Sequence, residues 1–330
     1  MDAWSVIFWD VGQGDATDII LPDGGHILID AGPLAKWENP LPWWFAQQGR
    51  PVIDLAILTH SHLDHFGGFV TLAGDPYQRI KRFVLLPDAE FRKSRENRNA
   101  DMNNLLGALK TRKMSGKTDS MLLTEPTELH RANGLTLKMA YPDSLPSTPP
   151  ADVNRTSMVL ILAKEVSGEP LIVWGGDNTL KNIGRTCEGR SPFILMGPHH
   201  GHPQDKSKTP AYWRFFRDQL RPKCAFVSVG RQNSHRLPNV CYIKGASCAG
   251  VRICCSQLAT NCDEGRQLDV YGGSGALGLP KPKESVQCRG ALRVYASANS
   301  GVSFDKFQAS YEGAIRMILP EVPCKCHSLG

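Results

Sequence analysis

The sequence predicts an α/β fold in which strands outnumber helices and pack in layers. Short apolar runs recur along the chain, separated by clusters of Gly, Pro, Asn and Asp that favour turns. Helix-like segments, roughly 89–113 and 209–220, fall between some of these runs. The composition is that of a globular protein, with 41% hydrophobic and 21% charged residues among 330. Strands interleaved with a few helices favour an α/β sandwich over a helical bundle.

The N-terminal segment predicts a β-meander, and the elements that follow predict further strands. The meander strands are expected at 4–11, 16–22 and 26–32, followed by a loop and short helix at 36–49 and a buried strand at 51–60. Six more strands are expected, at 82–87, 135–142, 157–165, 170–177, 193–200 and 223–230.

A change in composition near residue 240 predicts a domain boundary. Eight of the ten cysteines follow it, in Gly- and Ser-rich surroundings: Cys241, Cys248, Cys254, Cys255, Cys262, Cys288, Cys324 and Cys326. We therefore expect a main domain at 1–240 and a small Cys-rich C-terminal extension at 241–330.

The N-terminus lacks the basic and apolar regions of an export signal, and no apolar run approaches the roughly 18 residues of a membrane span. These features predict a soluble, cytoplasmic protein. Disulfides are not expected in the cytoplasm, so the Cys-rich C-terminal extension is expected to hold either reduced thiols or a structural zinc ion. The CxxC pairs of a zinc ribbon are absent from the sequence. Such an extension could also recruit a protein partner.

Positive charge is concentrated in one segment. The formal net charge is +6, and the segment 79–119 alone holds eleven Lys or Arg against five Asp or Glu. A solvated helical face and a phosphate-binding surface both explain such a segment, and the sequence leaves the two open.

The stretch ILTHSHLDHFGG places three histidines and an aspartate directly after an apolar run. We expect the strand to end near Thr59, so that His60 and His62 point the same way in extended chain. A helix starting at Asp64 would put Asp64 and His65 in its first turn. Imidazole nitrogen and carboxylate oxygen bind Zn²⁺, Mn²⁺ or Fe, and two such clusters close together indicate a dinuclear metal site.

This stretch resembles the HxHxDH motif of the metallo-β-lactamase superfamily. Other segments resemble its ComEC-type branch, the hydrolase domain of DNA-uptake competence proteins and of stand-alone bacterial relatives. In chain order they are DVGQGDA at 10–16, LIDAG at 28–32, NRTSMVLIL at 154–162, VWGGD at 173–177 and PHHGH at 198–202. The resemblance covers about residues 5–236. It implies an αββα sandwich, here with the small Cys-rich extension, and makes 1–240 the hydrolase domain.

The resemblance implies a ligand set for two divalent ions, zinc or manganese. His60 and His62 would bind the first ion, Asp64 and His65 the second, and Asp177 would bridge both. Asp64 would also orient the hydroxide that attacks the substrate.

A later histidine would complete the second site. His199, His200 and His235 compete for this role, and we favour His200. His199 or His235 would then protonate the leaving oxygen, with His235 expected nearer the substrate.

One departure from the superfamily concerns the first ion. Many members supply it with a third histidine from a loop before the bridging Asp, yet His130 is the only histidine between Phe66 and Gly176. His130 reads as part of a surface turn. Asn154, where the branch typically has Asn, would face the metals or the substrate instead. The first ion is then weakly held, or the site works with one metal.

Three acids lie in glycine turns of the N-terminal meander. Capping of the local backbone is the ordinary role of Asp10, Asp15 and Asp30 in such turns. The resemblance places the loop from Asp10 to Asp15 at the rim of the active site, which makes a substrate-orienting role the second interpretation of these two.

The predicted function is a metal-dependent hydrolase, a phosphodiesterase or nuclease that uses metal-activated hydroxide on DNA, RNA or a nucleotide. Two alternatives stay open. One is hydrolysis of a non-phosphate ester, thioester, lactone or lactam. The other is a catalytically silent binding or scaffold protein of a bacterial defence or DNA-uptake system, against which the complete set of ligand residues argues.

Overall fold

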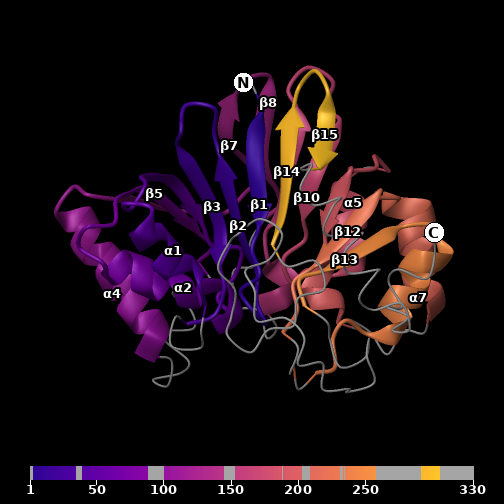
Figure 1. The fold of residues 1–330 in the computed structure, drawn as a ribbon, viewed down its shortest axis with the longest axis horizontal. Coiled ribbons are helices and arrows are strands. Elements are labelled where there is room, and N and C mark those ends of the chain that lie inside the picture. The colour runs from indigo at the N-terminus through magenta and orange to yellow at the C-terminus, as the bar shows by residue number, and fades with distance from the viewer. Residues whose placement is uncertain are drawn as a thin grey trace.

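Two β-sheets pack face to face, and helices cover the outer face of each (Figure 1). The structure is a computed structural model that describes residues 3–34, 39–87, 100–144, 153–187, 189–202, 209–230, 233, 235–257 and 291–304. The αββα sandwich predicted from the sequence is confirmed.

The first sheet has the strand order β15-β14-β1-β2-β3-β4-β5-β6. Its strands are β1 (Trp4–Phe8), β2 (Ala16–Ile20), β3 (His26–Ala31), β4 (Ile53–Ile57), β5 (Ile80–Leu85), β6 (Asp119–Leu122), β14 (Leu292–Ser297) and β15 (Gly301–Phe304). β1, β2 and β3 form the expected antiparallel meander, whereas β3 to β6 run parallel. The loops after β3 and β4 therefore leave the sheet at the same edge.

The second sheet has the strand order β13-β12-β11-β10-β9-β8-β7. Its strands are β7 (Thr127–Ala132), β8 (Leu135–Tyr141), β9 (Val159–Lys164), β10 (Pro170–Trp174), β11 (Ile194–Met196), β12 (Cys224–Val227) and β13 (Arg252–Cys255). β10 to β13 are parallel, so the loops after β10 and β11 also share one edge. These loops carry the histidines and the aspartate discussed below.

Three layers of buried apolar side chains hold the sandwich together. The central layer joins the two sheets, for example through Phe8 and Ile57 on one side and Trp174 and Phe226 on the other. The first sheet packs outward on α1 (Leu41–Gln47), α2 (Leu63–Gly74) and α4 (Ala100–Met114). The second packs on α5 (Leu180–Thr186), α6 (Thr209–Arg214), η4 (Phe215–Leu220) and α7 (Val240–Cys248). Two short turns, η2 (Val153–Thr156) and η3 (Pro198–Gly201), border the site.

β6 and β7 are among the strands that were not expected from the sequence. Both are edge strands with mostly polar, partly exposed residues, which removes the apolar alternation that marks a strand. His130 lies in β7 rather than in the expected surface turn, and its ring packs edge-on against Trp4, with the ring centroids 5.4 Å apart.

The described part of the predicted extension packs on the sheets through α7 or belongs to them. β13 extends the second sheet, and the hairpin of β14 and β15 lies beside β1, with Val294 opposite Val6 (Figure 1). Residues 258–290 and 305–330, with four of the cysteines, lie outside the described residues. The division at residue 240 stays a prediction.

Within the described residues, no helix is both long and apolar enough to cross a lipid bilayer.

Candidate metal centre

The turn from β4 into α2 builds one side of the site. His62 is the N-cap of α2 and has an extended backbone, whereas the chain bends at His60 and Ser61. His60 Nε2 lies 3.0 Å from His62 Nδ1. Asp64 and His65 occupy the first turn of the helix, as expected.

Two glycines let α2 approach the first sheet closely. A Cβ atom on Gly68 would lie 2.1 Å from the carbonyl oxygen of Ala31, and one on Gly67 would lie 2.3 Å from the amide nitrogen of Leu34. No side chain fits at either position. The close contact fixes the first turn of α2 against the loop that follows β3.

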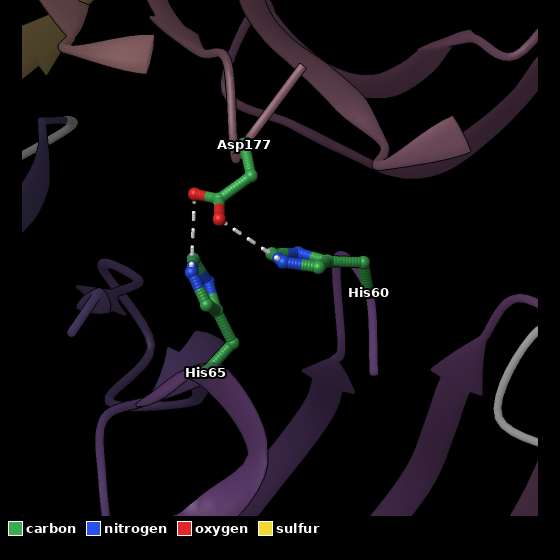
Figure 2. A group of neighbouring side chains, drawn as sticks. All are labelled: His60, His65 and Asp177. Carbon is green, nitrogen blue, oxygen red and sulfur yellow. Dashed lines mark ion pairs between the residues drawn. The ribbon is translucent and has the colours of Figure 1, made fainter. Parts of the chain in front are cut away.

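Asp177 approaches from the opposite sheet, in the loop after β10. Figure 2 shows its carboxylate between two imidazoles from the first half of the molecule. Asp177 Oδ2 lies 3.4 Å from His60 Nε2, and Oδ1 lies 3.3 Å from His65 Nε2. The two oxygens therefore face different ligand groups, which is the arrangement that a bridging carboxylate needs.

His199 and His200 reach the same carboxylate from the loop after β11. His200 is buried, with Nε2 3.2 Å from Asp64 Oδ2 and 3.7 Å from Asp177 Oδ1. His199 Nε2 lies 3.4 Å from the other oxygen, Asp177 Oδ2. Both histidines have left-handed backbone conformations, with φ of 49° and 52°. Such residues cost roughly 1–3 kcal/mol each and persist where surrounding structure holds them.

Asp30 fixes the orientation of His65. Its carboxylate accepts hydrogen bonds from the amide and hydroxyl of Thr59, at 2.8 and 2.7 Å, and from His65 Nδ1 at 2.8 Å. His65 Nε2 is thereby directed toward Asp177. The expectation that Asp30 caps its local backbone was wrong, because the side chain crosses to the next strand and to α2.

Ser157 and Thr59 hold His60 in the same way. Ser157 Oγ lies 3.3 Å and Thr59 Oγ1 3.1 Å from His60 Nδ1, which leaves Nε2 toward Asp177. Ser157 Oγ also accepts from the amide of Asp177 at 3.2 Å. One hydroxyl thus links a ligand from each half of the sandwich.

Asp15 lies beneath His200 on the side away from Asp64. His200 Nδ1 donates to the carbonyl of Ser228 at 3.0 Å and lies 3.2 Å from Asp15 Oδ1. Asp15 is 4% exposed, so this contact positions an imidazole. The substrate-orienting role expected for Asp15 stays a prediction.

The protonation states of the histidines divide into two groups. Burial, helped by the nearby His65, lowers the pKa of His60 to about 3, so His60 is neutral. Burial also acts to lower the pKa values of His65 and His200, but adjacent carboxylates overcome it and hold both well above the usual range. Burial alone would raise the pKa of Asp177, whereas His65 and His60 bring it well below the usual range. Without metal, imidazolium groups neutralise the buried carboxylate.

The chemistry of these residues fits divalent metal ions. Three buried atoms, His65 Nε2, His200 Nε2 and Asp177 Oδ1, have no hydrogen-bond partner among the described residues. Buried polar atoms of this kind need a partner, and a cation coordinated by nitrogen and oxygen supplies one. Ligand atoms lie within 4.8 Å of one another in three groups: His60, His65 and Asp177; Asp64, His65 and His200; and Asp15, Asp30 and His65.

Asp10 and Asn154 lie outside these groups, as do His62, His199 and His235. Asp10 is fully buried and accepts hydrogen bonds from the amide of Gly12 and, at 2.7 Å, from Gln257 Nε2. Asn154 is partly buried in η2, and its carbonyl accepts from the amide of Ser157, the residue that holds His60.

His235 is exposed and lies near the histidine loop. Its ring centroid is 6.2 Å from that of His202, which stacks on His199 at 4.6 Å. The rings of His202 and His199 thus separate His235 from the carboxylate of Asp177. This position fits a residue that does not bind the metal.

The described part of the basic segment makes mainly structural contacts. Arg112 is buried, and its guanidinium donates to the carbonyls of Ala73, Gln78 and Asp75 at the end of α2. Lys81 pairs with Asp54. Residues 88–99, with four cations of this segment (Arg92, Lys93, Arg95 and Arg98), lie outside the described residues.

None of the cysteines in the described ranges forms a disulfide, and no metal-binding group found in those ranges contains one. Cys224 and Cys254 lie in the apolar layer between the sheets. A structural zinc ion in the C-terminal extension stays a prediction.

Sequence reasoning missed the supporting residues Asp30, Thr59 and Ser157. Each is a common polar residue at the end of a strand or in a loop, and each makes a contact with a residue distant in sequence. The only local signal was the position of Thr59 directly before the first histidine of the motif.

The model of the metallo-beta-lactamase superfamily matches residues 9–76, which include the whole histidine motif after β4. This match supports the resemblance to the superfamily. The chain is 24% identical over 253 residues to ComE operon protein 3 of Bacillus subtilis (strain 168), a match that covers 70% of this chain and 29% of that protein. The chain thus spans under a third of that relative.

Two solved structures are similar to this chain at low identity. Igni18, a metallo hydrolase from the archaeon Ignicoccus hospitalis, is 16% identical, with a TM-score of 0.38, over 68% of this chain and 82% of its own. A diphosphatase from the PhnP family is 15% identical, with a TM-score of 0.40, over 71% of this chain and 88% of its own.

Proposed function

We propose that this member of the metallo-hydrolase superfamily is a phosphodiesterase, with nucleic acid or a nucleotide as substrate and two divalent ions as cofactors. The observation that carries the proposal is the placement of Asp177. Its Oδ2 faces His60 and His62, and its Oδ1 faces His65 and His200. A carboxylate shared between two ligand groups is the basis of a two-metal hydrolytic site.

Divalent ions at such a site supply Lewis acidity and lower the pKa of water to near neutrality. In this proposal Asp64 both holds the second ion and orients the attacking water. Asp64 suits this role because it is an anion: burial acts to raise its pKa, but His200 and His65 keep it below the usual range. His235, exposed beside the histidine loop, donates the proton to the leaving oxygen.

Cationic side chains near the site favour a phosphate substrate. Arg155 is exposed and follows Asn154 in η2, and Arg236 is exposed and follows His235. Phosphodiester hydrolysis spreads negative charge over oxygens that cations stabilise. Asn154, with Asp10 and Asp15, is retained as a substrate-binding residue of the proposal.

The similarity to ComE operon protein 3 supports the ComEC-type branch predicted from the sequence. That resemblance favours DNA among the nucleic acids. Cytoplasmic location and recruitment of a protein partner by the C-terminal extension remain predictions.

The test compares purified wild-type protein with the Asp64→Ala/His65→Ala variant. Metal content is measured by mass spectrometry, and hydrolysis is assayed on bis-p-nitrophenyl phosphate, single- and double-stranded DNA, RNA and cyclic nucleotides. We expect metal content and phosphodiester cleavage both to fall in the variant. Asp143→Ala is the control, because Asp143 is exposed and pairs with Arg185.

Metal retained without cleavage of any phosphodiester would overturn the proposal. Activity on a thioester, lactone, lactam or carboxylic ester would then support the first alternative. Bound metal with no activity on any of these substrates would favour a binding or scaffold protein.

A further inference from the structure

We propose that His199 supplies the third imidazole to the first metal ion, the one held by His60 and His62. This inference rests on the metal-binding part of the proposed function. It fills the position for which the sequence left open His130, Asn154, a weakly held ion or a site with one metal.

The first observation is which oxygen of Asp177 each histidine faces. Asp177 Oδ2 lies 3.4 Å from His60 Nε2, 3.7 Å from His62 Nδ1 and 3.4 Å from His199 Nε2. Three imidazole nitrogens therefore approach the same carboxylate oxygen. Three histidines and a bridging carboxylate make a complete ligand set for a divalent ion.

The second observation is that neighbouring residues face opposite oxygens. His200 faces Asp177 Oδ1 and Asp64, on the side of the second ion. The rings of His199 and His200 are 6.3 Å apart and inclined by 67°. One loop thus contributes a ligand to each ion.

The third observation is the backbone that makes this possible. His199 and His200 both have positive φ, and Gly201 follows with φ of 74°. The amide of His199 donates to the carbonyl of Gly176 at 2.9 Å, which ties the loop to the residue before Asp177. A left-handed backbone is unfavourable for residues other than glycine, and here it occurs at two consecutive histidines. Such a conformation persists where the surrounding structure holds it, and here it directs both imidazoles toward Asp177.

His130 is not available for the role. It lies in β7 at the edge of the second sheet, with its ring against Trp4. His202 stacks on His199 and, through that contact, supports the ring from the other face.

Zinc binding tests the proposal without recourse to activity. Equilibrium dialysis and mass spectrometry give the number and affinity of ions in wild type, His199→Ala, His60→Ala and the double variant. Wild type should bind two Zn²⁺. Loss of a residue that only hydrogen-bonds to a metal ligand already lowers metal affinity about 10–100-fold. Loss of the ligand His199 in His199→Ala should therefore weaken the binding of one ion at least that much. The double variant should bind zinc about as weakly as the weaker-binding single variant, because both substitutions remove a ligand of the same ion.

Further readouts separate a ligand from a merely structural residue. Added imidazole should restore part of the affinity of His199→Ala, and the Co²⁺-loaded variant should show a changed visible absorption spectrum. His235→Ala should retain both ions with unchanged affinity. Circular dichroism checks that each variant is folded.

Two ions bound by His199→Ala with wild-type affinity would overturn the inference and leave the proposed function intact. Loss of an ion in His235→Ala instead would also overturn it. Absence of any bound metal in wild type would overturn the inference together with the proposed metal site.

Discussion

At the scale of single residues, buried carboxylates decide how the metal ligands are presented. Asp30 accepts from Thr59 and from His65 Nδ1, so His65 can offer only Nε2 to an ion. Asp15 and the carbonyl of Ser228 do the same for His200. The ligand types follow from the motif, whereas the ring orientations depend on residues far away in sequence.

Replacing Asp30 with Asn should weaken metal binding while retaining the fold. The amide has a similar shape but no charge, so it supports a metal-bound His65 less well. Outer partners of this kind contribute about 10–100-fold to metal affinity. Competition with a chromophoric chelator measures the change, and Asp143→Asn serves as an exposed control. Unchanged affinity in Asp30→Asn would mean that His65 keeps its orientation without the carboxylate.

Metal binding should release protons and strengthen as pH rises. His65 and His200 have raised pKa values in the metal-free protein, so both hold protons at neutral pH that an ion must displace. His60, with a pKa of about 3, releases none. Falling pH therefore favours the protonated, metal-free form. Calorimetry in buffers of different ionisation enthalpy should detect about two protons released near neutral pH, and a pH-independent affinity would contradict this.

At the scale of elements, the position of α2 determines where Asp64 and His65 lie. Gly67 and Gly68 let the first turn of this helix contact the first sheet closely. The contact partners, Ala31 and Leu34, could not be named in advance because they depend on how the helix crosses the sheet.

Gly68→Ala should destabilise the protein by about 1–3 kcal/mol, because the new methyl group has no room beside the carbonyl of Ala31. Gly74 lies in the same helix with nothing within 4 Å of an added Cβ. Gly74→Ala should therefore stabilise, by about 0.5–1 kcal/mol. Urea denaturation of both variants makes the comparison. Equal effects would show that the helix contact is less close than described.

Arg112, which lies in α4, caps the C-terminal end of α2. Its guanidinium donates to three carbonyls, of Ala73, Gln78 and Asp75. Arg112→Lys should lose most of these bonds and cost about 1–3 kcal/mol, since the carbonyls are left without donors. Lys113→Ala, on the exposed side of α4, should change stability little. The free energy of unfolding distinguishes this structural role from a substrate role, which would reduce activity without changing stability.

At the scale of the whole molecule, the sequence predicted the sandwich, the histidine motif and the bridging aspartate. Their signals are local: apolar periodicity for strands and a short motif for the ligands. The edge strands β6 and β7 gave no such signal, because their residues are partly exposed and polar. The pairing of β14 with β1 joins segments nearly the full chain apart, and residue spacing carries no information on such contacts.

This long-range pairing gives a test of the boundary predicted at residue 240. Val294 is fully buried between the sheets and lies opposite Val6. Val294→Asp would bury a charge in the central layer and should cost about 3–5 kcal/mol. Ser303→Asp, exposed on β15, is the matched control with little expected effect. If the hydrolase domain folds independently of residues 241–330, its unfolding transition will be the same in Val294→Asp as in wild type. A single transition shifted to lower urea would instead show that β14 belongs to the cooperative unit that positions the metal ligands.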